Sequence, residues 1–226
     1  MYQKILFDLD GTLTDPKEGI CKSVQYALEA FGIKEEDIDK LTPFIGPPLK
    51  NSFMEFYGMS GEDAEEAVEK YRERFSVTGL YENKVYAGIP EMLGHLREKG
   101  YRMAIASSKP TVFVNRILQH FSLDRYFDVV VGSELNGKRV NKDEVIKEAV
   151  RELFREEAVC YRQVVMVGDR KFDVEGAKVF GMDCIGVDYG YAQNNELAEA
   201  GAAYVVSDVG KLEQLLLSLY DGGVTV

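Results

Sequence analysis

Short apolar runs recur along the chain, and a polar or acidic residue follows within two positions of each of them. The runs are KILF at 4–7, MAIA at 103–106, VVV at 129–131, VVMV at 164–167 and CIGV at 184–187. Within each run the apolar residues are consecutive rather than alternating, which is typical of strands buried on both faces of a parallel sheet. We therefore predict a β-strand at each run.

The segments between these runs have apolar residues three and four positions apart, the spacing of an amphipathic helix. This pattern predicts helices over 89–99, 111–120, 142–155 and 211–220. Strands that alternate with helices indicate an α/β fold, in which helices cover both faces of a parallel sheet. Ligands bind at the carboxyl ends of the strands in such sheets, so the polar residues after the runs are expected to converge on one edge.

One segment interrupts this alternation. From Pro16 to about Asn83 the chain has helical spacing and no strand-like run, which predicts about four helices inserted after the first strand. We therefore predict an α/β core formed by residues 1–15 and 84–226, and an inserted α-helical cap domain at 16–83. A helical insertion at this place would act as a lid that excludes water and selects substrates.

Composition and charge limit the possible partners. The chain has 226 residues, 46% of them hydrophobic, which is enough for a real core, and its formal net charge is -11. Nucleic acid polymers and acidic membranes are bound mainly through Lys and Arg, so we expect neither as a partner. A small phosphorylated metabolite, met by a few local cations, remains compatible with this charge. The sequence does not distinguish a monomer from a homodimer.

The cysteines and the amino terminus indicate a cytoplasmic protein. Cys21, Cys160 and Cys184 are an odd number, widely spaced and without a CxxC pair, so neither a disulfide framework nor a thiolate zinc site is predicted. The first residues lack the long apolar stretch of a secretion signal, and no run approaches the length of a membrane span.

The stretch FDLDGTLTD at 7–15 gathers carboxylates where the first strand is expected to end. Residues two apart in a strand point to the same side, so Asp8 and Asp10 are expected to face one pocket. Adjacent carboxylates repel one another unless a cation offsets their charge, and Mg²⁺ prefers oxygen ligands. In VGDRKFD, Asp169 and Asp173 follow another strand and supply further oxygen ligands. The sequence therefore predicts a site for Mg²⁺ and a phosphate group.

Four motifs in this order, DLDGTLTD, IASSK, NKDEVI and GDRKFD, with a helical insertion after the first, resemble the haloacid dehalogenase superfamily of phosphatases. The resemblance covers essentially the whole chain. It implies a Rossmann-like parallel sheet core with an inserted α-helical cap, and Mg²⁺-dependent hydrolysis of a phosphomonoester.

The resemblance also implies roles for the acidic residues. Asp8 would be the nucleophile that forms an aspartyl-phosphate. Asp10 would protonate the leaving alkoxide and then deprotonate the attacking water. Asp169 would bind Mg²⁺ together with the Asp8 carboxylate and the Asp10 backbone carbonyl, and Asp173 would support the metal site.

The same resemblance implies that Ser107 hydrogen-bonds the phosphoryl oxygens and that Lys142 offsets the charge of nucleophile and phosphate. Thr12, Ser108 and Lys50 are further candidates for contact with the substrate. Lys109 and Lys138 compete with Lys142 for the cationic role.

Several residues have a purely structural alternative. Ser107 and Asp173 could instead cap helices that begin near Pro110 and Val174. In the cap, Phe44 or Phe53 could stack on a substrate base or form part of the cap's core.

The expected activity is that of a phosphoglycolate phosphatase-like or 5'-nucleotidase-like enzyme. A sugar phosphomutase, which would use the same two aspartates, and a pyrophosphatase are the alternatives. A signalling module that carries a long-lived phosphoaspartate is a third. The stretch GSELNGKR at 132–139 resembles a P-loop but has Arg139 where the Ser or Thr that binds Mg²⁺ is required, so a P-loop NTPase is not expected.

Overall fold

The computed structural model describes residues 2–155 and 157–220. The chain divides into two compact units. The core unit is formed by Met1–Thr14 and Val85–Val226, and the insertion unit by Asp15–Lys84. The chain passes between them at β2 (Thr14–Asp15) and β3 (Lys84–Val85), which pair with each other.

The core unit is built on a parallel sheet with the strand order β5-β4-β1-β6-β7-β8. The strands are β1 (Lys4–Phe7), β4 (Arg102–Pro110), β5 (Val129–Ser133), β6 (Val164–Gly168), β7 (Asp183–Val187) and β8 (Tyr204–Val206). The first strand lies between β4 and β6, with Leu6 opposite both Ala104 and Met166. The ends of β4, β1 and β6 are therefore neighbours at one edge.

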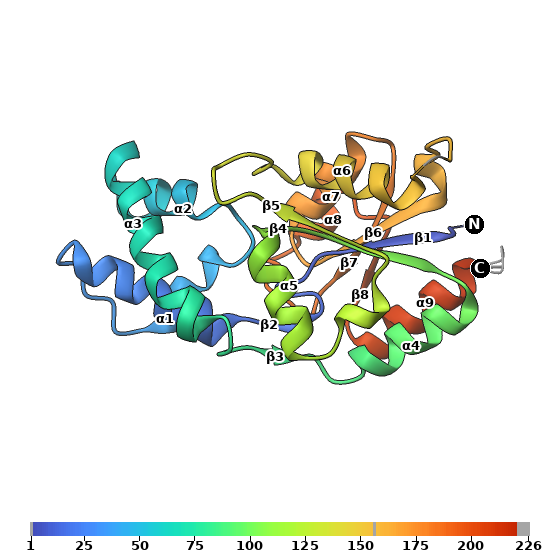
Figure 1. Cartoon of the computed structure of the whole chain (residues 1–226), viewed down its shortest axis with the longest axis horizontal. Helices are drawn as coiled ribbons and strands as arrows, with labels where there is room; N and C mark the ends of the chain where they lie inside the picture. Colours follow the sequence, from blue (N-terminus) through green and yellow to red (C-terminus); the bar gives the residue numbers. More distant parts are fainter. Residues whose placement is uncertain (1, 156, 221–226) are drawn as a thin grey trace. The chain divides into compact units, whose positions relative to one another are not determined.

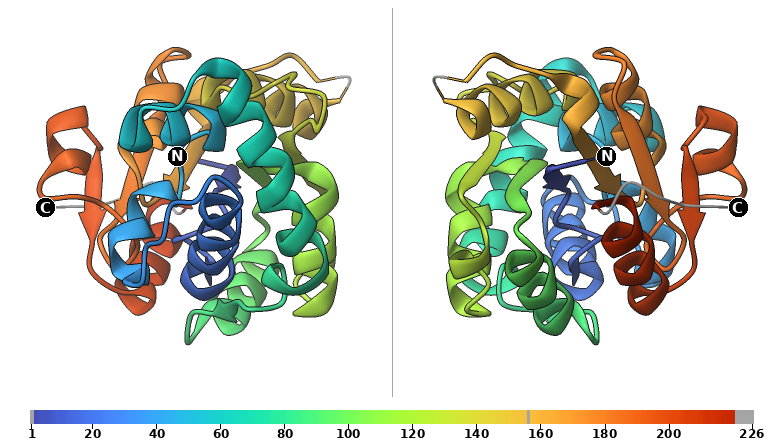
Figure 2. Two further views of the ribbon diagram at one scale, coloured as in Figure 1. Left: turned by 90° about the vertical axis from the view of Figure 1, so that its left-hand side faces the viewer. Right: turned by 90° about the vertical axis from the view of Figure 1, so that its right-hand side faces the viewer.

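Helices cover both faces of this sheet (Figures 1 and 2). One face carries α4 (Ile89–Lys99), α5 (Thr111–His120) and α9 (Val209–Tyr220). The other carries α6 (Lys142–Phe154), α7 (Lys171–Lys178) and α8 (Glu196–Ala200). Short 3-10 helices, η3 (Asp124–Tyr126) and η4 (Tyr161–Gln163), precede β5 and β6. The α/β fold class predicted from the apolar pattern is confirmed.

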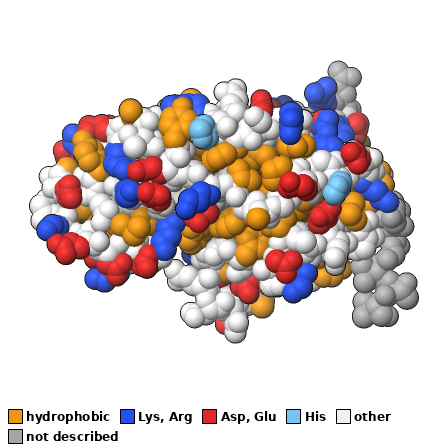
Figure 3. Space-filling model, turned by 90° about the horizontal axis from the view of Figure 1, so that it is seen from below, with side chains coloured by type: hydrophobic (Ala, Val, Ile, Leu, Met, Phe, Trp, Pro, Cys, Tyr) orange, Lys and Arg blue, Asp and Glu red, His pale blue; other side chains and the backbone are white. Residues whose placement is uncertain are grey.

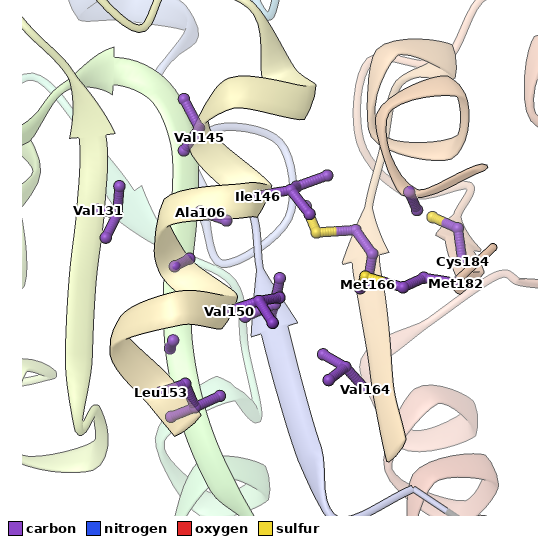
Figure 4. Packing of buried hydrophobic residues seen from close by; sticks show 14 of the residues in the cluster. Ala106, Val131, Val145, Ile146, Val150, Leu153, Val164, Met166, Met182 and Cys184 are labelled. Carbon is purple, nitrogen blue, oxygen red and sulfur yellow. The ribbon is translucent and has the colours of Figure 1, made fainter. Parts of the chain in front are cut away.

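The core beneath α6 is formed by aliphatic side chains from helix and sheet (Figure 4). Val145, Ile146 and Val150 of α6 pack toward Ala106 on β4 and Met166 on β6, and the helix residues are fully buried. Removing a buried Val or Ile side chain from water stabilises the fold by about 1.5–3 kcal/mol. This packing holds the first turn of α6 against the edge where β1 and β6 end.

Two differences from the predicted strands bear on the site. The strand predicted at 103–106 continues to Pro110 as β4, with a register irregularity after Ala106. Gly132 of β5 permits this, because a Cβ there would lie 2.2 Å from the Lys109 carbonyl oxygen. The short strand β8 was not predicted, because its residues are mostly exposed and only three positions long.

The insertion unit, residues 15–84, is described throughout, and helices joined by short loops make up its interior between β2 and β3. Its elements are α1 (Lys17–Ala30), η1 (Ile38–Phe44, 3-10), α2 (Leu49–Tyr57), α3 (Gly61–Arg74) and η2 (Phe75–Gly79, a π-helical turn). Phe44 and Phe53 are buried in this unit with their ring centroids 5.0 Å apart. The alternative in which they stack on a substrate base is therefore not supported.

The face of the molecule drawn in Figure 3 carries mixed charge. On the face drawn in Figure 3, the described Lys and Arg side chains are interspersed with Asp and Glu, and hydrophobic side chains lie among them. No helix within residues 2–155 and 157–220 has the length and apolarity needed to cross a membrane.

Candidate active site

Four acidic side chains are buried where β1 and β6 end. Asp8 and Asp10 follow β1, Asp169 follows β6, and Asp173 lies in the first turn of α7. Each is at most 7% exposed. Carboxylates are seldom buried without a compensating cation or donor, so this arrangement indicates a functional site rather than an acidic surface turn.

Glycine is required where these segments meet. Gly11 has φ +81°, and a Cβ at this position would lie 2.0 Å from Asp169 Oδ2. Gly168 is equally confined, since its Cβ would lie 2.1 Å from the Asp173 carboxyl carbon. The absence of two side chains thus allows the Asp8 loop and the β6 end to approach closely.

Asp8, Asp169 and Asp173 form a cluster that could hold a metal ion, with one carboxylate oxygen from each lying within 4.8 Å of the others. Asp169 Oδ2 accepts a hydrogen bond from the Tyr191 N–H at 2.7 Å. Asp173 Oδ2 accepts one from the Arg170 N–H at 3.0 Å, so Asp173 both caps α7 and belongs to the cluster. The cluster consists of hard oxygen donors, the ligand type that Mg²⁺ prefers.

Lys142 pairs with two of the acidic side chains, Asp8 and Asp173. Its Nζ is 2.9 Å from Asp8 Oδ1 and 2.7 Å from Asp173 Oδ1, and it donates a hydrogen bond to the Ala106 carbonyl oxygen at 2.9 Å. Burial alone would lower the pKa of Lys142, but attraction to Asp173 and Asp8 outweighs it and raises the pKa. The two carboxylates therefore favour the charged, ammonium form of Lys142.

Lys109 is a second lysine at the site, and its side chain is only 7% exposed. Its sequence position made it a competitor of Lys142 for the cationic role. Its Nζ lies 2.9 Å from Asp10 Oδ1 and 2.7 Å from Asp10 Oδ2. The continuation of β4 beyond Ala106 carries Lys109 to the site, and this continuation was not predicted. Lys138, the other competitor, is exposed in the loop before α6.

The pKa values of three carboxyl groups reflect this crowding. Burial raises the pKa of Asp10, and Lys109 partly offsets the effect. Burial, with repulsion from Asp173 and Asp8, raises the pKa of Asp169 well above its ordinary value. The pKa of Asp173 is also raised by burial, against the attraction of Lys142. Without further positive charge, these groups resist becoming ionised together.

The residues predicted to bind the phosphate group or the substrate lie partly at the acidic site and partly in the insertion unit. Ser107 is buried in β4, and its Oγ accepts a hydrogen bond from the Lys109 N–H at 3.4 Å. Thr12 Oγ1 lies 3.5 Å from Asp169 Oδ1. Ser108 is half-buried, and its carbonyl oxygen accepts a hydrogen bond from Ser133 Oγ at 2.7 Å. Lys50 belongs to the insertion unit, where it pairs with Glu65.

The loop that resembled a P-loop has a different role. Arg139 donates from Nε to the Gly132 carbonyl oxygen at 3.1 Å and forms an ion pair with Glu134. These contacts close the 132–139 loop on itself.

A parallel sheet with buried carboxylates and lysines at its carboxyl edge, and a helical unit inserted after the first strand, defines the chain as an α/β enzyme. The family model described as Haloacid dehalogenase-like hydrolase matches residues 5–187. The chain belongs to this family, as its four motifs predicted.

Relatives match over nearly the whole chain. A 5'-nucleotidase from Pseudomonas aeruginosa is 48% identical over 96% of this chain and 96% of its own. The tyrosine-protein kinase PtkA from Mycobacterium tuberculosis is 36% identical over 94% of this chain and 71% of its own. Among solved structures, the crystal structure of a predicted phosphatase from Clostridium acetobutylicum superimposes with a TM-score of 0.92. The two sequences are 46% identical, and the match covers 96% of this chain and 99% of the phosphatase chain. The prediction of a phosphatase-type hydrolase is confirmed at the level of the family.

Proposed function

We propose that this chain hydrolyses small phosphomonoesters with the help of Mg²⁺, through an aspartyl-phosphate formed on Asp8. The proposal rests above all on one observation. Asp8, Asp169 and Asp173 form a buried carboxylate cluster, the Lys142 ammonium group pairs with Asp8 and Asp173 of that cluster, and Asp10 stands two residues after Asp8. A nucleophile, a metal cluster and an acid are thereby close together.

The charges in the site support a divalent cation. Four carboxylates and two ammonium groups, counted as ionised, leave two negative charges in a buried space. Asp8 Oδ1 and Asp173 Oδ1 are near Lys142, but neither contact has hydrogen-bond geometry. Asp8, Asp169 and Asp173 would hold Mg²⁺ by their side chains, and the family resemblance adds the Asp10 carbonyl oxygen. Bound there, Mg²⁺ would stabilise the negative charge on the transferring phosphoryl group.

In the first step, the Asp8 carboxylate attacks phosphorus and the bond from phosphorus to the ester oxygen breaks. The Asp10 carboxyl group gives its proton to that oxygen, so the product leaves as an alcohol. The raised pKa of Asp10, caused by burial, keeps a proton available at higher pH than for an exposed aspartate. Lys142 offsets the charge on Asp8 and on the incoming phosphate, and the Ser107 hydroxyl can donate to a phosphoryl oxygen.

In the second step, the Asp10 carboxylate takes a proton from a water molecule, which attacks the phosphorus of the aspartyl-phosphate. The bond from phosphorus to Asp8 breaks, inorganic phosphate leaves, and both aspartates return to their starting state. One residue thus serves as acid and then as base, as microscopic reversibility requires.

Nucleoside 5'-monophosphates are the substrates that we propose to test first. The relative named 5'-nucleotidase is 48% identical in sequence, and the match covers 96% of each chain. Phosphoglycolate is the second candidate, through the family resemblance. We expect Thr12, Ser108 and Lys50 to contribute to substrate binding, and a cytoplasmic location.

Phosphate release from a panel of substrates tests the proposal. The panel contains nucleoside 5'-monophosphates, phosphoglycolate, pyrophosphate, sugar phosphates and a phosphotyrosine peptide, each with Mg²⁺ and with a chelator. We expect one class of monoester to be hydrolysed, and only with Mg²⁺. Isomerisation of a sugar phosphate without phosphate release would indicate a phosphomutase instead, and transfer from ATP to tyrosine would indicate the activity in the PtkA name.

A further inference from the structure

The segment Tyr189-Gly190-Tyr191, which follows β7, lies against the acidic site. The Asp188 N–H donates to the Val206 carbonyl oxygen at 2.9 Å, which anchors the start of the segment to the edge strand β8. Beyond this anchor, Gly190 contacts Gly11 and Asp169. The segment therefore touches both the Asp8 loop and the carboxylate that follows β6.

Two hydrogen bonds connect the segment to the site. The Tyr191 N–H donates to Asp169 Oδ2 at 2.7 Å, and the Tyr189 hydroxyl donates to the Thr12 carbonyl oxygen at 2.9 Å. The Tyr189 ring packs edge-on against Tyr86, with centroids 5.1 Å apart, and the Tyr86 N–H donates to the Leu13 carbonyl oxygen at 3.1 Å. The loop carrying Asp8 and Asp10 is thus held at two successive carbonyl groups.

Gly190 makes this contact possible. A Cβ at this position would lie 2.3 Å from the Gly11 carbonyl oxygen and 2.5 Å from Asp169 Cβ. Both distances are well inside van der Waals contact, and one of the two contacts is to backbone. Any side chain at 190 must therefore displace the Gly11 turn, Asp169 or the segment itself.

The consequence for Asp169 is a fixed orientation. Its carboxylate is fully buried and lies close to two other carboxylates, which repel it. A charge-assisted hydrogen bond from a backbone N–H stabilises the ionised form and restrains the rotamer. The Tyr191 N–H can keep this hydrogen bond to Asp169 only if the segment 189–191 is held in place.

We propose that Tyr189-Gly190-Tyr191 is a positioning segment for the metal-binding carboxylate of Asp169. Gly190 permits the close approach, Tyr191 supplies the N–H donor, and the Tyr189 hydroxyl fixes the segment to the Asp8 loop. The inference rests on the proposed function in one respect, since it takes the acidic cluster to be a Mg²⁺ site.

The test compares wild type, Gly190→Ala, Tyr189→Phe and Gly94→Ala. Gly94 lies in α4, where an added Cβ would meet no atom within 4 Å, so Gly94→Ala is a matched control. Calorimetric titration with Mg²⁺ alone gives the metal affinity of each folded variant. Thermal unfolding in a chelator gives the stability without metal, and steady-state kinetics on the best substrate of the panel separate kcat from KM.

We expect Gly190→Ala to bind Mg²⁺ at least about tenfold more weakly, the range found when residues that support metal ligands are changed. Tyr189→Phe, which loses a single hydrogen bond, should weaken Mg²⁺ binding about fivefold and lower kcat more than it changes KM. Gly94→Ala should bind Mg²⁺ as wild type does. A merely structural role would lower the unfolding temperature in chelator and leave the Mg²⁺ affinity unchanged.

The outcomes separate this inference from the proposed function. Unchanged Mg²⁺ affinity in folded Tyr189→Phe and Gly190→Ala, with wild type binding Mg²⁺ normally, would overturn the inference alone. If Gly190→Ala does not fold, Tyr189→Phe decides. A wild-type protein that binds no Mg²⁺ would overturn the proposed metal site and the inference with it.

Discussion

At the scale of single residues, the ion pair between Lys109 and Asp10 is expected to contribute to both stability and activity. Asp10 is buried, and Lys109 contacts both of its carboxylate oxygens. Lys109→Met removes this ammonium group and leaves a buried carboxyl group without it. We expect the free energy of unfolding to fall by about 3 kcal/mol, the order found when one partner of a buried ion pair is removed. We also expect kcat/KM to fall about tenfold or more, because Asp10 would lose its orientation.

Lys138→Met is the matched control for this change. Lys138 belongs to the same chemical class and is exposed in the loop before α6. Lys138→Met should change neither the free energy of unfolding, measured by chemical denaturation, nor kcat/KM. Equal effects of the two substitutions would show that the contact with Asp10 is unimportant.

Site residues could be predicted from the sequence where they belong to a recognisable motif, and not where their contacts depend on the fold. The sequence indicated Asp8, Asp10, Asp169 and Asp173 because they follow two of the apolar runs. The structure brings Asp8, Asp169 and Asp173 into one cluster and buries Asp10 near Asp8. Lys142 was preferred to Lys109 and Lys138 for the cationic role, and the pairing of Lys109 with Asp10 was not predicted, because the position of Lys109 depends on how far β4 extends. The segment Tyr189-Gly190-Tyr191 carried no signal, since its contacts are made by backbone atoms and a hydroxyl across distant parts of the chain.

At the scale of elements, α1 and the turn η2 approach each other closely inside the insertion unit. A Cβ at Gly19 would lie 1.9 Å from the Gly79 carbonyl oxygen, and the Gly19 N–H donates to the Glu82 carbonyl oxygen at 3.0 Å. Gly19→Ala should therefore lower the free energy of unfolding by about 1–3 kcal/mol through overpacking. Chemical denaturation measures the change.

Gly61→Ala is the control, because a Cβ at Gly61, in the first turn of α3, would meet no atom within 4 Å. We expect it to be neutral or slightly stabilising, since alanine favours the helix. If Gly19→Ala were as stable as Gly61→Ala, α1 and η2 would have to be less closely packed than described.

Helices and strands were predicted correctly from the sequence where the apolar spacing and the boundary residues were clear. The helices predicted at 89–99 and 111–120 coincide with α4 and α5, since each has a clear apolar stripe and a Pro or Gly at its boundary. The extension of β4 was missed because its last residues, Ser107 to Pro110, are polar or lack an N–H donor. The close approach of Gly132 on the neighbouring strand β5 accommodates the extension, and it depends on a residue distant in the sequence.

At the scale of the whole molecule, the excess of negative charge in the site links metal binding to stability. Three of its carboxyl groups have raised pKa values, with burial as the largest cause. A bound divalent cation would offset this repulsion. A ligand at one hundred times its Kd stabilises the folded state by about 2.7 kcal/mol, which for a chain of this size raises Tm by about 5–10 °C.

Thermal unfolding in Mg²⁺ and in a chelator, at matched ionic strength, checks this expectation. Asp169→Asn removes one carboxylate of the cluster and should abolish most of the Mg²⁺-dependent rise in Tm. A rise of equal size in Asp169→Asn would mean that Mg²⁺ acts elsewhere on the protein.

The central claim is that Asp8 carries the phosphoryl group, and trapping that species tests it most directly. Asp10→Asn is mixed with an aryl phosphate, whose leaving group needs no proton, then quenched in acid and mapped by mass spectrometry. Because the base for the second step is missing, we predict phosphate bound covalently to Asp8 in Asp10→Asn and no phosphorylated peptide in Asp8→Asn. Hydrolysis by Asp8→Asn at the wild-type rate, with no phosphorylated Asp8 in Asp10→Asn, would contradict the account.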